Sequence, residues 1–317
     1  MNTDTTDREA LADTANPLAI EGIEYIEYAT AKPQALGQVL EQLGFKPIAR
    51  HRSREVLLYR QGGMNVIVNA HAGTVAPPES PALAAIALRV RDAAAAHARV
   101  LELGAWDVPV QVAPMELHIP AIHGAGASRL YFVDRHREFS IYDVDFVPIP
   151  NVAGADAQPP ALAGLHWFGV VQYIGDGRMD DWLHFYATLF GFRVLQDDER
   201  FGILPRGRVL QSPDRSFYWQ LIEPDPVMVT DSDERLQRVA FGVPDVLAAV
   251  HALQTRGVGF VETASLHVES RGALTKSSLG GLMFELVKHG GSMEPPSSLR
   301  SLPPEGAVSP LGRPGGR

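Results

Sequence analysis

Apolar and polar positions along the chain form a pattern that occurs twice, and each occurrence predicts a strand followed by a helix. Ile23–Tyr28 and Phe168–Ile174 have the apolar character of buried strands. Each is followed by an amphipathic helical stretch that ends at a glycine, Gly44 or Gly191. The same pattern predicts further strands at Glu55–Tyr59, Met64–Asn69, Phe201–Leu204 and Phe217–Ile222, with closing pairs at Leu130–Val133 with Phe139–Phe146 and at Ala273–Ser277 with Leu282–Val287.

The strand-and-helix unit between these segments repeats at a fixed offset of about 153 residues, and such an offset indicates a duplicated module. One copy begins at Ile86 and ends at Gly104, and the other begins at Val239 and ends at Gly257. The positions in register are Ala87/Ala240, Val90/Val243, Asp92/Asp245, Ala95/Ala248, Ala96/Ala249 and Gly104/Gly257. A structure that placed these pairs in unrelated elements would contradict the duplication.

The predicted fold class is therefore α+β, with two tandem modules that each contain paired β-α-β-β-β units. Each module is expected to form a cupped, partly open mixed sheet with its helices outside, so that alternate residues of several strands meet on the concave face. The expected boundaries are a disordered N-terminus over 1–17, a first module over 18–150, a linker over 151–162, a second module over 163–291 and a disordered tail over 292–317.

Composition narrows the functional classes. The chain has 317 residues, a net charge of −9 and no cysteine, which disfavours nucleic-acid binding and excludes disulfides and thiolate metal sites. The polar start of the chain lacks the features of a signal peptide, and no apolar run is long enough for a membrane span. We expect a soluble, cytoplasmic protein, and apolar outer helix faces would allow a homo-oligomer.

Two segments identify a likeness to a known family. Ile119-Pro-Ala-Ile122 followed by Tyr131-Phe-Val-Asp134, and then Ile141-Tyr-Asp-Val-Asp-Phe146, resemble motifs of the 4-hydroxyphenylpyruvate dioxygenase family, within the vicinal oxygen chelate (glyoxalase/bleomycin resistance/dioxygenase) superfamily. The segment 51–62 is similar to the dioxygenase-like portion fused to some 3-dehydroshikimate dehydratases. The resemblance covers roughly residues 20–290.

The resemblance implies a non-haem Fe(II) dioxygenase of aromatic amino acid catabolism, with the metal in the second module. In that family two histidines and a glutamate hold the iron, and a 2-oxo acid occupies open positions. The glutamate corresponds to Glu285, but Arg238 stands in place of one histidine and Gly169 in place of the other. His166 can replace the missing histidine if its strand is shifted, and His267 is a second substitute.

Other expected family features are absent. The family's two polar substrate contacts on the middle strands correspond to Gly207 and Ile222, and the Pro- and Gly-rich tail has no counterpart of its C-terminal gating helix. Gln172 and Gln220 are candidate substrate contacts if they face the concave side of the sheet. Strand alternation would otherwise direct Tyr173 and Trp219 there.

Two hypotheses follow from the residues at the expected metal position. In the first, Glu285 and His166 bind Fe(II) and Arg238 holds the carboxylate of an aromatic or 2-oxo acid substrate. In the second, the protein is a metal-free binding protein or non-oxidative enzyme in which Arg238 and Glu285 form an ion pair, since an arginine stays charged and does not ligate metal. We expect Fe(II) binding to be weak or absent unless His166 or His267 completes the site.

Overall fold

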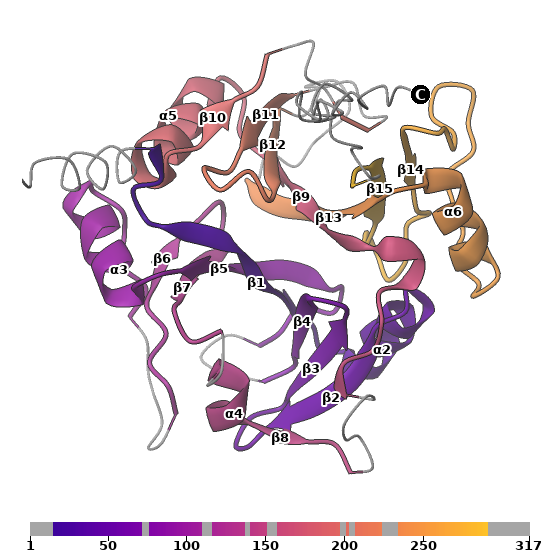
Figure 1. Ribbon diagram of the computed structural model, residues 1–317, viewed down its shortest axis with the longest axis horizontal. Coiled ribbons are helices and arrows are strands. Elements are labelled where there is room, and N and C mark those ends of the chain that lie inside the picture. Colours follow the sequence, from indigo (N-terminus) through magenta and orange to yellow (C-terminus); the bar gives the residue numbers. More distant parts are fainter. Residues whose placement is uncertain are drawn as a thin grey trace, which may run out of the picture.

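The computed structural model describes residues 15–71, 76–109, 116–136, 140–150, 157–196, 201–202, 207–223 and 234–290. These residues form two mixed β-sheets with few helices, one sheet in each predicted module (Figure 1). The first module contributes the lower sheet of Figure 1 and the second module the upper one. The α+β fold class of two tandem modules is thus confirmed.

The first sheet has eight strands in the order β6-β7-β5-β1-β4-β3-β2-β8. Its central strand pair, β1 and β5, is antiparallel, while β1 with β4 and β5 with β7 run parallel. The strands are β1 (Ile20–Ala29), β2 (Lys46–His51), β3 (Val56–Gln61), β4 (Met64–Asn69), β5 (Ala82–Val90), β6 (Ala121–His123), β7 (Arg129–Val133) and β8 (Phe146–Pro148).

The second sheet repeats this pattern with seven strands in the order β10-β11-β12-β9-β13-β15-β14. The pair β9 and β13 takes the place of β1 and β5, and β13 runs parallel to β15 as β5 does to β7. The strands are β9 (His166–Tyr173), β10 (Arg193–Val194), β11 (Arg208–Gln211), β12 (Tyr218–Ile222), β13 (Arg235–Val243), β14 (Gly272–Leu274) and β15 (Phe284–Lys288).

The helices explain why particular residues repeat in the sequence. Asp92 and Asp245 occupy the N-cap positions of equivalent helices, and each carboxylate accepts a hydrogen bond from the backbone N–H three residues later, at 2.9 and 3.1 Å. Gly104 and Gly257 follow those helices with φ of 92° and 91°, a conformation that favours glycine. The helices are α2 (Pro33–Gln42), α3 (Ala93–Glu102), α4 (Ile141–Asp145), α5 (Met179–Phe190), α6 (Val246–Gln254) and the short 3-10 helix η2 (Leu162–Gly164). In the part of the chain that the structure covers, no helix is long and apolar enough to cross a membrane.

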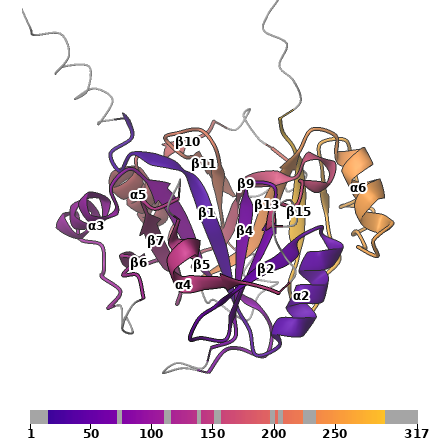
Figure 2. The same cartoon turned by 60° about the horizontal axis from the view of Figure 1, so that its bottom comes forward.

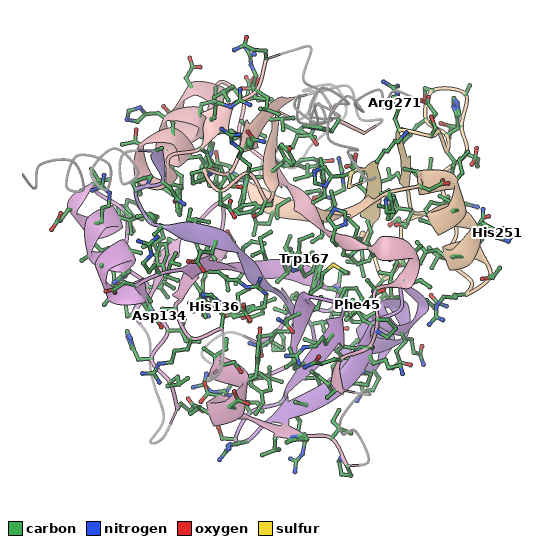
Figure 3. The ribbon with its side chains drawn as sticks, in the orientation of Figure 1. Phe45, Asp134, His136, Trp167, His251 and Arg271 are labelled. Carbon is green, nitrogen blue, oxygen red and sulfur yellow. The ribbon has the colours of Figure 1, made fainter. Side chains whose placement is uncertain are left out.

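The modules share one large core formed by the faces that carry the helices. Figures 1 and 2 both place α3 beside α5 and α2 beside α6, so each side of the molecule has one helix from each module. Between the sheets, Trp167 stacks on Phe241 with ring centroids 5.5 Å apart, and Phe45 lies 6.4 Å from Trp167 (Figure 3). The opposite, concave face of each sheet, here called its cup, has a separate smaller cluster of buried residues.

One predicted strand is wrong. Residues 139–146 were expected to pair with β7, but the described residues form helix α4 followed by β8, which pairs with β2. The Asp143 carboxylate accepts hydrogen bonds at 2.8 Å from both the backbone N–H and the hydroxyl of Ser140, and this cap starts a helix. Strands β2, β6, β10 and β11 were not predicted. Of the strand expected over Phe201–Leu204, residues 201–202 are not in a strand and residues 203–204 lie outside the described residues.

Candidate functional site

The cup of the second module contains a buried ion pair. Arg238 lies on β13 and Glu285 on β15, where Glu285 pairs in register with Ala240, two residues after Arg238. The Arg238 Nε atom is 3.6 Å from the Glu285 Oε2 atom, and only 6% and 4% of the two side chains are exposed. This register directs both side chains to the same face, as both hypotheses drawn from the sequence require.

The electrostatics of this pair are unusual for a simple salt bridge. Burial raises the pKa of Glu285 from its usual 4.5 to about 7, although the Arg238 guanidinium opposes that rise. Arg238 Nε and Glu285 Oε2 are both buried, and neither has a hydrogen-bond partner of normal length among the described residues. Buried polar atoms normally have such a partner, so this geometry leaves one donor and one acceptor available to a bound group.

Gly169 occupies the position at which the family resemblance implies a metal-binding histidine. It lies on β9, in register with Ala240 on one side and Tyr218 on the other. A Cβ atom added here would lie 2.4 Å from the backbone oxygen of Tyr218. No larger side chain fits at this position unless the two strands move apart.

His166 takes part in a different arrangement. It is the first residue of β9 and pairs in register with Gly242 of β13. Gly242 lies two residues after Ala240, which pairs with Glu285. Its Nδ1 is 3.0 Å from the Gly164 carbonyl oxygen, and its Nε2 is 2.8 Å from Nδ1 of His289. A carbonyl only accepts, so His166 carries its proton on Nδ1 and its Nε2 accepts from His289.

His289 was not identified from the sequence, because 123 residues separate it from His166. Burial, with the neighbouring His166, lowers its pKa below the usual 6.5. Its ring lies 5.3 Å from Phe168 and 6.1 Å from Tyr218, and both rings contact Phe201. These three aromatic residues, Phe168, Phe201 and Tyr218, are called the aromatic wall below.

The other candidate ligand, His267, is half exposed, with its Nε2 3.6 Å from a carboxylate oxygen of Glu269. The structure does not bring it to Glu285, which is buried. Across the described ranges, no three histidine, aspartate or glutamate side chains lie close enough together to hold a metal ion. Of the residues considered for the metal site, the structure brings together only Glu285 and Arg238.

The two glutamines face opposite sides of the sheet. Gln172 is fully buried on the helix side, where its Oε1 accepts hydrogen bonds from the Tyr186 hydroxyl at 2.6 Å and from the Trp219 indole at 2.9 Å. Of the two orientations that the sequence left open, Gln172 therefore takes the one that faces away from the cup. Gln220 pairs in register with Val171, which pairs with Arg238, so Gln220 shares the face of Arg238.

Known protein families match both modules of the chain. Residues 14–147 match the family model described as hydroxyphenylpyruvate dioxygenase, N-terminal, and residues 164–286 match that of the glyoxalase/bleomycin resistance protein/dioxygenase superfamily. The 4-hydroxyphenylpyruvate dioxygenase of Pseudomonas sp. strain P.J. 874 is 34% identical over 264 residues, covering 78% of this chain and 72% of the relative. The chain belongs to the 4-hydroxyphenylpyruvate dioxygenase family.

A longer relative and a solved structure are also similar to this chain. A 3-dehydroshikimate dehydratase of Pseudomonas aeruginosa is 34% identical over 260 residues, which are 76% of this chain but only 40% of that protein. Among solved structures, a variant of 4-hydroxymandelate synthase from Streptomyces coelicolor superimposes with a TM-score of 0.65 at 19% identity, covering 86% of this chain and 94% of the other. At that identity the likeness supports the fold alone.

The residues present do not fit the iron centre that the family implies. A guanidinium is a permanent cation without a lone pair to donate, so it repels a metal ion beside Glu285. Gly169 has no donor and no space for one, and the Nε2 of His166 is already paired with His289. One carboxylate remains of the three expected ligands, and a single carboxylate gives little affinity for Fe(II).

Proposed function

We propose that the cup of the second module binds a small organic acid, either an aromatic acid or a 2-oxo acid, on Arg238 without an iron centre. The observation that carries this proposal is the buried Arg238–Glu285 pair, whose Nε and Oε2 atoms lack partners of normal length. A buried guanidinium suits a carboxylate ligand because charge-assisted hydrogen bonds are strong where water is excluded.

The keto oxygen of a 2-oxo acid can accept a hydrogen bond from Glu285. Glu285 has a pKa of about 7, so near neutral pH a large fraction of this carboxyl group is protonated. In that form it donates a hydrogen bond to a ligand oxygen, while the Arg238 Nε–H donates to the ligand carboxylate. The protein therefore supplies one charged and one neutral donor for two adjacent oxygens.

The aromatic wall supports an aromatic ligand. Phe201 precedes Gly202, and a Cβ atom at Gly202 would lie 2.6 Å from the Glu285 Oε1 atom, so the wall begins directly beside the carboxyl group. Phe168 and Tyr218 stack with ring centroids 4.7 Å apart. A ring attached to the bound acid can extend along this apolar surface.

The test combines binding with metal analysis. Isothermal titration of the metal-free protein with 4-hydroxyphenylpyruvate and with phenylpyruvate should give binding that weakens roughly 10- to 100-fold in Arg238→Met, the range expected for a charged hydrogen bond. Arg271→Met is the matched control, because Arg271 is exposed and pairs with Glu269 in the same module. Unchanged binding in Arg238→Met would refute the proposal.

The competing function is the family's Fe(II) dioxygenase, and Glu285 at the expected ligand position favours it. Iron content after anaerobic loading with Fe(II), and oxygen consumption with 4-hydroxyphenylpyruvate, distinguish the two. Our proposal expects substoichiometric iron and little turnover. Stoichiometric iron that is lost in Glu285→Ala, together with oxygen consumption driven by the 2-oxo acid, would establish the dioxygenase instead.

A further inference from the structure

The first module has a polar cup of its own at the position equivalent to the site in the second. In the second module, Ala240 on β13 lies between Gly169 and Glu285. In the first, the equivalent Ala87 on β5 lies between Tyr25 and Tyr131. The two tyrosine rings have centroids 6.1 Å apart. The duplicated fold therefore places two phenol rings where the second module has a glycine and a glutamate.

The next row of the same face carries opposite charges. Ala85 lies in register between Glu27 on β1 and Arg129 on β7. The outer strands of such a row are about 9.6 Å apart, two spacings of about 4.8 Å. Ala85, which is 1% exposed, contributes only a methyl group to the middle of this row.

Glu27 has one oxygen available for a ligand. The residue is 8% exposed, and its Oε1 accepts a hydrogen bond from the Asn69 amide at 2.8 Å. The described residues provide no other hydrogen-bond donor to this carboxylate. Burial raises its pKa, while the Asn69 hydrogen bond and the charges of Arg129 and Arg54 lower it.

Arg129 is exposed at the rim of the cup, where its Nη1 donates to the Tyr131 hydroxyl at 3.3 Å. A purely structural pair would be closed, as Glu24 and Arg89 are in the same sheet, with Nε and Oε2 2.5 Å apart. Glu27 and Arg129 do not form such a contact: Glu27 accepts from Asn69, and Arg129 donates to Tyr131. Their arrangement is that of two charges separated by a gap.

We propose that the cup of the first module binds a small zwitterion, such as a free α-amino acid, with its ammonium group on Glu27 and its carboxylate on Arg129. Tyr131, which is partly exposed, flanks the same row and offers ring surface to an apolar or aromatic side chain. A ligand with only one charge would pair with only one of the two side chains, so a zwitterion should bind more tightly.

Isothermal titration with the full-length Arg238→Met variant tests this assignment by separating the two charges, because this variant lacks the arginine proposed to hold acids in the second cup. L-phenylalanine is the probe, 3-phenylpropanoate lacks its ammonium group, and phenethylamine lacks its carboxylate. We expect phenylalanine to bind roughly 10- to 100-fold more tightly than either analogue. Equal binding of 3-phenylpropanoate, or no binding of phenylalanine, would overturn the proposal.

Substitutions locate the site. Glu27→Gln keeps the shape of the side chain and an oxygen for Asn69, and Arg129→Gln changes an exposed residue, so the second variant remains informative if the first fails to fold. Added to Arg238→Met, both should weaken phenylalanine binding roughly 10- to 100-fold, whereas Arg271→Met, at an exposed arginine of the second module, should leave it unchanged. Loss of binding in Arg238→Met instead, or full binding in both first-module variants, would show that this cup is not the site.

Discussion

Replacing Glu285 with glutamine should remove a specific pH dependence from the stability of the protein. In the folded chain, burial holds the pKa of this carboxyl group at about 7, whereas in the unfolded chain it returns to about 4.5. Between these two values the folded state holds a proton that the unfolded state has lost. The free energy of unfolding therefore falls as pH rises through this interval and becomes level above about pH 7.

The size of the effect follows from the two pKa values. A rise from 4.5 to about 7 corresponds to roughly 3 kcal/mol, at about 1.36 kcal/mol for each pH unit. Glu285 is 3% exposed, so solvent screening is weak. Glutamine has nearly the same shape and does not titrate, so Glu285→Gln should lack this contribution and should be relatively more stable above pH 7 than below pH 4.5.

Urea unfolding followed by tryptophan fluorescence at constant ionic strength, from about pH 4.5 to pH 8, measures this difference. The quantity of interest is the unfolding free energy of the wild type minus that of Glu285→Gln, which should fall by roughly 3 kcal/mol across the interval. Glu269→Gln, which removes a carboxylate whose side chain is 36% exposed, is the control for losing a negative charge elsewhere in the module. Parallel curves for the wild type and Glu285→Gln would refute the assignment of a raised pKa to this residue.

Three other predictions test the packing around the site. Gly169→Ala should lower the free energy of unfolding, measured by chemical denaturation, by about 1–3 kcal/mol, because the new Cβ atom would lie 2.4 Å from a carbonyl oxygen of β12. Gly63→Ala is the matched control, because its Cβ atom would have no atom within 4 Å. Gln172→Leu should cost roughly 2–4 kcal/mol in the same assay, since it leaves two buried donors without an acceptor; a cost below about 0.5 kcal/mol would contradict this role. Asp92→Ala and Asp245→Ala should each cost about 1 kcal/mol by thermal unfolding, and clearly unequal losses would argue against equivalent caps.

The duplication could be predicted from sequence because the repeated residues are those that local structure requires. Asp92 and Asp245 cap the starts of equivalent helices, and Gly104 and Gly257 follow the ends of these helices with positive φ. The same residue types therefore recur at a fixed offset.

The segment 139–146 was assigned wrongly because its apolar residues suit a strand as well as a helix. The hydrogen bonds between Ser140 and Asp143 decide between the two.

The candidate site was predictable where the family resemblance covers it. Arg238 and Glu285 were expected to share the cup because they align with two ligand positions of the resembling family, and the structure places them 3.6 Å apart. The orientation of Gln172 was left open by the sequence, since alternation gives two choices and β13 contains register shifts beside it. His166 meets His289 because β15 pairs with β13 in the sheet, and no local sequence pattern predicts that strand pairing.

The two cups share a backbone register but carry different side chains, and this shows how the site of this chain differs from the metal site its family implies. The central strand pair has the same register in both modules, yet the row that holds Tyr25, Ala87 and Tyr131 in one holds Gly169, Ala240 and Glu285 in the other. Replacing Arg238 alone with histidine would not rebuild a three-ligand centre, because the backbone around Gly169 has no room for a side chain. The difference is thus set by backbone packing as well as by side-chain identity, and an Arg238→His variant should gain at most a weak two-ligand site.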